Sequence, residues 1–172
     1  MISTKISNRF RIILILPVVL MYSLSLELKA QEPPPRPIRI IATAQGLSFG
    51  AFYHGAAGGT ITINPAGARS STGDVVLLGL GYPFSAALFQ VRASAGTVIA
   101  ILNNPDVPIF GIPSGSMNLH IGSTNPTSPF VSTVPYTVPI PLYIGGTLTV
   151  GNSAANPPGS YTGTFDITIV RE

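Results

Sequence analysis

The chain has 172 residues, no cysteine and a formal net charge of +3. Without cysteine no disulfide can hold the fold together, so its stability must come from apolar packing and backbone pairing. The charge excess belongs to the N-terminal end, because residues 31–172 carry equal numbers of basic and acidic side chains. The basic ones are Arg36, Arg39, Arg69, Arg92 and Arg171, and the acidic ones are Glu32, Asp74, Asp106, Asp166 and Glu172. This neutral part has no basic cluster for phosphates, which argues against nucleic-acid binding.

Residues 1–30 have the organisation of a secretory signal peptide. A segment with Lys5, Arg9 and Arg11 precedes the apolar run IILILPVVLMYSLSL, and Ala30 offers a small residue for cleavage. Signal peptides combine these three parts, with an apolar core of about 7–15 residues. A retained membrane anchor is the alternative, but a spanning helix needs an apolar run of about 18 residues or more. We therefore expect a secreted protein in the periplasm, at the cell surface or outside the cell, with no membrane span after cleavage.

Residues 31–37 (QEPPPRP) are predicted to form a Pro-rich extended leader, and residues 38–172 a single all-β domain. Gly and Pro recur too often for a long amphipathic helix, and short β-rich runs lie between turn signals. The predicted strands are PIRIIATA (37–44), LSFGAFY (47–53), TITIN (60–64), DVVLLGL (74–80), ALFQVRA (87–93), TVIAILN (97–103), MNLHI (117–121) and IPLYIGGTLTV (140–150). Short strands at this spacing predict a sandwich or a barrel.

Three further segments complete the predicted domain. GAAGG (55–59) is predicted to be a flexible hairpin turn. NPTSPFVSTVPYTVP (125–139) contains four prolines and is expected to cross between sheets or to follow an edge, because proline cannot donate to a strand ladder. The final residues GSYTGTFDITIVRE alternate in the manner of one terminal strand. Its core-facing side chains would be Tyr161, Phe165, Ile167 and Ile169.

The sequence offers little for catalysis or metal binding. His54 and His120 are the only histidines, and neither has a carboxylate or second ligand at a recognisable spacing. The aspartates occur singly along the chain. We therefore predict no catalytic residue, no cofactor and no metal, and a protein that is not an enzyme.

Three blocks of sequence resemble a family of secreted bacterial domains, DUF4402. They are LSFGAF (47–52), TITINPAGARSSTGDVVLLG (60–79) and LYIGGTLTVGNSAANPPGSYTGTFDITIV (142–170). That family is similar to the spore-coat-U and fimbrial-subunit β-sandwiches. The resemblance implies an immunoglobulin-like or pilin-like antiparallel β-sandwich with a structural or adhesive role. The chain has neither the Cys pair nor the penultimate Tyr that chaperone–usher pilins usually carry.

The leading hypothesis is a surface subunit, fimbria-like or coat-like, that assembles by strand addition to an exposed sheet edge. The terminal strand would supply the acceptor edge. PIRIIATA is a candidate donor, with Ile38, Ile40, Ala42 and Ala44 facing one way, or else an ordinary first strand of its own domain. The expected partners are other copies of the chain or other surface subunits, with a periplasmic chaperone as a further candidate.

A monomeric binding module for glycan or another surface ligand is the alternative function. It would use exposed loop aromatics, for which Phe84, Phe110, Phe130 and Tyr136 are candidates. A hydrolase is disfavoured because histidine and acidic residues are scarce.

The signal peptide gives the first testable prediction. The exported protein should begin near Gln31, because cleavage after Ala30 removes both the basic segment and the apolar core. N-terminal sequencing of the exported protein checks this. A mature chain that still carries Met1 or the apolar run would contradict it.

Overall fold

The computed structural model describes residue 34, residues 36–102 and residues 105–172. The predicted signal peptide and most of the Pro-rich leader lie outside the described residues. The chain divides into two units, residues 1–35 and residues 36–172. All the strands of the described residues belong to the second unit.

Thirteen strands make up the regular structure, and no helix occurs in the described part of the chain. They are β1 (Arg39–Ala42), β2 (Ser48–Phe49), β3 (Phe52–Ile63), β4 (Arg69–Leu77), β5 (Phe84–Ser85), β6 (Ala87–Arg92), β7 (Val98–Leu102), β8 (Val107–Ile112), β9 (Ser116–Asn125), β10 (Phe130–Val131), β11 (Ile140–Val150), β12 (Ser160–Thr162) and β13 (Thr168–Arg171). The prediction of an all-β domain is confirmed.

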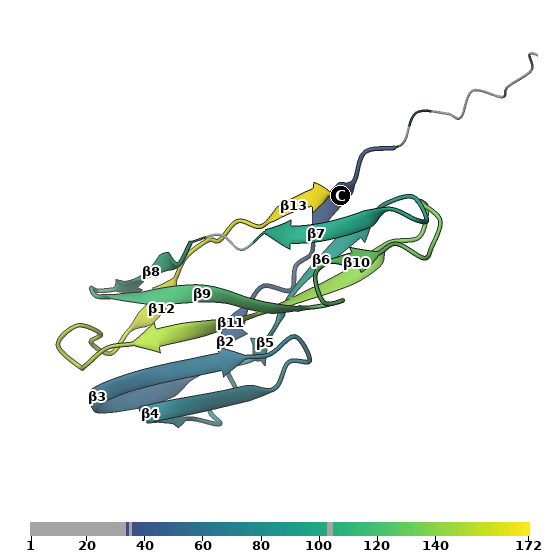
Figure 1. Cartoon of the computed structure of the whole chain (residues 1–172). Helices are drawn as coiled ribbons and strands as arrows, with labels where there is room; N and C mark the ends of the chain where they lie inside the picture. Colours follow the sequence, from purple (N-terminus) through teal and green to yellow (C-terminus); the bar gives the residue numbers. More distant parts are fainter. Residues whose placement is uncertain (1–33, 35, 103–104) are drawn as a thin grey trace, which may run out of the picture. The chain divides into compact units, whose positions relative to one another are not determined.

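The strands form one large and two small antiparallel sheets (Figure 1). The large sheet has the order β1-β6-β11-β9-β8-β12, and β3 joins it on β11 while β4 follows on β3. A second sheet has the order β10-β7-β13, and β2 pairs with β5 alone. Every pairing in the described residues is antiparallel.

Strand β11 has three partners in the large sheet, because two different strands pair with successive halves of one of its edges. Ile140–Ile144 pair with β6, whereas Gly146–Val150 pair with β3. The opposite edge pairs with β9, with an irregular register between Ile144 and Gly146. Gly145 lies at this branch, where a Cβ atom would collide with the carbonyl oxygen of Ile63. A glycine is therefore required where three strands meet on β11.

The core lies between the large sheet and the β10-β7-β13 sheet. Ile61, Val91, Leu142 and Leu148 from the large sheet share one buried cluster with Ile99 of β7. Alternation explains this placement, since every second side chain of a strand points to the same face. Two packed antiparallel sheets with one shared core are the architecture of a β-sandwich.

The Pro-rich segment 125–139 connects the two sheets, as its prolines predicted. It leaves β9 in the large sheet, contributes β10 to the second sheet and returns to β11. The contact with the second sheet is short: Phe130 and Val131 pair with Ile99 and Val98 of β7.

Two sequence predictions about strand boundaries were wrong. GAAGG is not a turn but the middle of β3, where the register with β4 shifts between His54 and Gly59. Asp74 on β4 supports this irregular stretch, because its carboxylate accepts the backbone N–H of Ala57 at 3.3 Å. The turn lies instead at residues 64–68, where the Asn64 side chain accepts the backbone N–H of Ala68 at 2.9 Å.

The terminal segment is also not a single strand. Residues 160–162 pair with β8 in the large sheet as β12, and residues 168–171 pair with β7 in the second sheet as β13 (Figure 1). The segment between them crosses from one sheet to the other. Alternation of residue types does not reveal such a crossing, because every second side chain of the segment can point into the shared core before and after the crossing.

The packing of this segment predicts different effects for two adjacent truncations. The ring of Phe165 makes an edge contact with Phe89 at 6.3 Å between centroids and packs against the core, whereas Thr164 is exposed. Phe165→Ala should lower the free energy of unfolding by about 3 kcal/mol, near the lower end for Phe truncations because the ring is half-buried. Thr164→Ala should cost no more than about 0.5 kcal/mol. Equal urea midpoints for the two variants would contradict the packing.

Candidate functional site

An open groove with a volume of about 1080 Å³ runs beside the C-terminal segment. Its floor consists of buried apolar side chains from three neighbouring strands of the large sheet: Ile109 of β8, Met117 and Leu119 of β9, and Leu148 of β11. These side chains reach the groove because they occupy inward positions of their strands. The groove is thus an opening onto the hydrophobic core of the sandwich.

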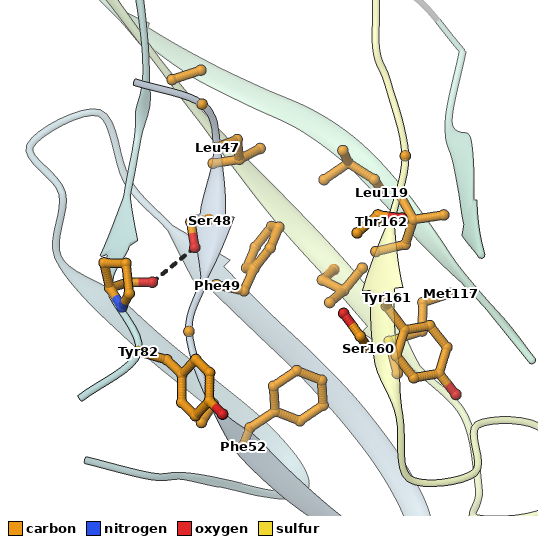
Figure 2. A pocket seen from close by; sticks show the side chains of 18 of the residues that line it. Leu47, Ser48, Phe49, Phe52, Tyr82, Met117, Leu119, Ser160, Tyr161 and Thr162 are labelled. Carbon is orange, nitrogen blue, oxygen red and sulfur yellow. Dashed lines mark hydrogen bonds between the residues drawn. The ribbon is translucent and has the colours of Figure 1, made fainter. Parts of the chain in front are cut away.

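The first wall is formed by the segment around β2 together with the loop before β5. Leu47, Phe49 and Phe52 line this side with Tyr82, and Figure 2 shows them opposite the C-terminal segment. The two parts of the wall are connected by the β2–β5 pairing and by Ser48, whose hydroxyl donates to the Pro83 carbonyl at 2.8 Å (Figure 2).

Arg69 holds this first wall in place from β4. Its guanidinium donates to the carbonyl oxygens of Phe49 at 2.9 Å, Ala51 at 3.2 Å and Leu78 at 3.1 Å. The same group lies over the ring of Phe84, 4.4 Å from the centroid. Gly50 allows the close approach, because it has a φ of +67° and a Cβ there would lie 2.7 Å from Nη1. One planar cation therefore connects both segments of the wall.

The second wall is the C-terminal segment from Asn156 to Phe165, which includes β12. The buried side chain of Asn156 anchors its beginning: the amide group donates to the Ser116 carbonyl at 2.6 Å, and the amide oxygen accepts the N–H of Gly151. The hydroxyl of Tyr161 donates to the Pro157 carbonyl at 2.7 Å. Figure 2 shows Tyr161 and Thr162 across the groove from Phe49.

Charge is missing from the groove lining. Among the described residues that border it there is no Asp, Glu, Lys or Arg, and His54 is the one histidine. The ring nitrogens of His54 face backbone carbonyls, Nε2 that of Asn156 at 2.9 Å and Nδ1 that of Gly55 at 3.2 Å. The lining therefore suits an uncharged, largely apolar ligand.

The second histidine and the acidic residues lie elsewhere. His120 is exposed on β9, and its Nδ1 contacts the Asp106 carboxylate at 2.7 Å. Within the described residues, no three His, Cys, Asp or Glu side chains are grouped closely enough to hold a metal ion. A membrane-spanning helix is likewise not found in that part of the chain.

The structure brings together only part of the predicted assembly strand. Tyr161 and Phe165 border the groove. Ile167 and Ile169 pack against the core, but Ile169 pairs with Ile101 in the second sheet.

The candidate donor segment forms an edge strand of its own domain. β1 pairs with β6 through four residue pairs, from Arg39↔Arg92 to Ala42↔Phe89. Ile40, Ala42 and Ala44 are exposed, whereas Ile38, just before the strand, packs partly against the core.

The four candidate aromatics for ligand binding differ in exposure. Phe84 and Phe110 are exposed, at 45% and 62%. Phe130 packs against the core, and the half-buried Tyr136 lies under the Arg36 guanidinium at 5.2 Å.

Sequence reasoning missed the two residues that hold the groove walls, Arg69 and Asn156. Both lie in blocks that carried the family resemblance, NPAGAR and NSAANPPGSYTG. A weak signal was present for Arg69, since it is a lone cation in a long uncharged stretch that runs from Ile40 to Gly73. Asn156 precedes two prolines, a pattern that by itself indicates only a turn.

These features define a class: an antiparallel β-sandwich whose C-terminal segment borders an open apolar groove. The chain belongs to the DUF4402 family, because the family model, described as a domain of unknown function, matches residues 40–170. The resemblance to DUF4402 noted in the sequence is thereby confirmed. The chain matched no curated protein and no solved structure.

The anchoring of the first wall can be tested by replacing Arg69. Arg69→Met should lower the free energy of unfolding by about 2 kcal/mol, because hydrogen bonds to charged groups contribute about 1.5–3 kcal/mol. It should also accelerate hydrogen exchange in residues 46–52 and 78–84, with β9 and β11 unchanged. Arg69→Lys is the control, because it keeps the charge but lacks the planar guanidinium with its several donors. It should restore only part of the protection of these two segments from exchange. Unchanged exchange in the wall of Arg69→Met would contradict this role.

Proposed function

We propose that this protein is a secreted, non-enzymatic subunit of a cell-surface structure, fimbria-like or coat-like, which assembles by β-strand addition. The observation that carries the proposal is the groove: an apolar floor lies between two extended backbone walls. A strand from a neighbouring molecule fits this arrangement, because its backbone would pair with a wall while alternate side chains reach the floor.

Unpaired strand edges support this interpretation. Within the described residues, β12 pairs with β8 alone and is the last strand of its sheet, and β2 pairs with β5 alone. Edges of this kind are templates for another chain, and proteins that avoid pairing protect them with charge or proline. Ser160–Thr162 carry neither, and Asp166 is the only charged residue from Gly159 to Val170.

The size of the groove favours a peptide segment over a small molecule. Pockets for small ligands have volumes of about 300–1,000 Å³ and enclose most of the ligand surface. This groove lies at the upper end of that range, and it is an open groove rather than an enclosed cavity.

The absence of enzymatic activity is supported by the roles of the two histidines. His54 is engaged with two backbone carbonyls, and the His120–Asp106 pair lies on the exposed surface, with side chains 54% and 56% exposed. Export is supported by the basic and apolar segments of residues 1–30.

A second candidate function is a binding module for glycan or another surface ligand. The exposed rings of Tyr82 and Phe110, at 67% and 62%, favour it, because aromatic rings supply large contact areas to ligands. Tyr82 borders the groove, whereas Phe110 lies on β8 and does not.

Strand addition predicts that a charge at the groove rim will block self-association. Tyr82→Asp places a carboxylate at the rim of the uncharged groove, and Tyr53→Asp makes the same change at a comparably exposed position (55%) outside the lining. Light scattering with size-exclusion chromatography of residues 31–172 should show concentration-dependent oligomers for wild type and Tyr53→Asp, and monomers for Tyr82→Asp. A wild-type protein that remains monomeric at high concentration would contradict strand addition and favour the binding module.

A further inference from the structure

We propose that the outer face of strands β1 and β6 carries a phosphate-binding site formed by Arg39 and Arg92. The ligand is a phosphate monoester group, carried either by a lipid headgroup or by a small soluble molecule. Neither arginine borders the groove, so the site is separate from the proposed strand acceptor. Its test therefore does not depend on whether the protein assembles.

The two arginines are far apart in the sequence but neighbours in the sheet. The antiparallel register of β1 and β6 pairs Arg39 directly with Arg92. Side chains of such a pair lie on the same face, with Cβ atoms about 4.5–5.5 Å apart. Val91, next to Arg92, is fully buried in the core, so both arginines point away from the core. The sequence of residues 31–172 shows no basic cluster, and only the pairing of the strands creates this one.

Neither guanidinium is neutralised by the described part of the chain. Arg69 binds three backbone carbonyls, and Arg36 lies over the ring of Tyr136. Arg39 and Arg92 have no hydrogen-bond or ion-pair partner among the described residues. The Nε–H of Arg92 is even buried without an acceptor. Because buried donors nearly always have a partner, such an exception indicates a functional role or a bound ion.

The pair costs stability unless something neutralises it, because like charges directly opposite each other destabilise a sheet. Protection of a sheet edge against unwanted pairing would explain Arg39, since β1 is an edge strand. It does not explain Arg92, because β6 pairs with β1 on one side and with β11 on the other. A bound anion accounts for both residues, because it replaces the repulsion with charge-assisted hydrogen bonds.

The charge and the donors of this pair suit a phosphate better than a carboxylate. A carboxylate has a single charge, and one guanidinium can occupy both of its oxygens in a bidentate contact. A phosphate monoester carries a charge of about −1.5 to −2 at pH 7 and has three acceptor oxygens, so it can serve both guanidiniums. Gln90 lies on the same outer face, two residues before Arg92, and adds an uncharged amide donor.

Titration of the isotope-labelled exported protein with inorganic phosphate tests the site by nuclear magnetic resonance. The amide resonances of residues 39–41 and 90–92 should shift and reach saturation, while those of β9 should not move. Sodium acetate at the same ionic strength is the control for a carboxylate and should leave the resonances of both segments unchanged.

Arg39→Gln and Arg92→Gln should each weaken phosphate binding by at least about tenfold, because each removes charge-assisted hydrogen bonds. Arg171→Gln is the matched control, since it removes the same charge from an exposed position of β13 in the second sheet. It should weaken binding by less than about threefold, because salt screens charges that do not touch the ligand.

Thermal unfolding separates binding from a merely structural role of the two arginines. Phosphate should raise the midpoint of wild type and of Arg171→Gln, because a ligand that binds only the folded state stabilises it. The midpoints of Arg39→Gln and Arg92→Gln should not respond to phosphate. Variants that are destabilised equally at every phosphate concentration would contradict the site.

Sedimentation with phosphatidylcholine vesicles, prepared with or without phosphatidic acid, identifies the source of the phosphate. Vesicle binding that needs phosphatidic acid and both arginines indicates a lipid headgroup, whereas binding of inorganic phosphate alone indicates a soluble molecule. A wild-type protein that binds neither probe overturns the proposal. Equal weakening in all three variants also overturns it, because net charge alone would then explain binding, as does acetate that binds as well as phosphate.

Discussion

The change of neighbour along β11 is the constraint on which the rest of the structure depends. One edge of this strand pairs with β6 over residues 140–144 and with β3 over residues 146–150, while the other edge pairs with β9. Because β6 and β3 pair with successive halves of the same edge, they meet near Gly145, and β2 pairs with β5 instead of joining the large sheet. Leu148 and its neighbours on β9 and β8 form the floor between the two walls. The groove is therefore a consequence of how the sheet branches.

A polar side chain anchors each wall to the rest of the domain. Arg69 binds three carbonyls of the first wall, and the buried Asn156 fixes the start of the second. Such anchors satisfy backbone groups that no ladder satisfies, and leaving buried polar groups unpaired is costly. Arg69 and Asn156 stand in the sequence blocks that resemble the DUF4402 family, to which the chain belongs. We infer that these blocks specify the walls of the groove, while the alternating strands supply the floor.

Local patterns predicted the fold class and most strands but not the connections between sheets. Alternation placed Phe165 inward correctly, because burial of one face leaves a period of two in the sequence. The same period could not show that the terminal segment changes its pairing partner from β8 to β7 between Tyr161 and Ile169. In both pairings the same set of alternate side chains of the segment points inward. Glycine-rich residues 55–59 suggested a turn, yet backbone pairing with β4 and the Asp74 carboxylate hold them in a strand. Arg69 was beyond sequence reasoning, because its partners are backbone carbonyls 9–20 residues away that no residue type identifies.

Hydrogen exchange at low and high protein concentration tests the central claim most directly, namely that the groove accepts an extended strand. Residues 46–52 and 159–165 belong to the walls, and added strands protect backbone amides by hydrogen bonding. Strand addition predicts that exchange in one or both of these segments slows as the protein associates, while the central strands β9 and β11 stay as they were. Association with unchanged exchange in both walls would contradict strand addition at the groove, because the molecules would then meet through another surface.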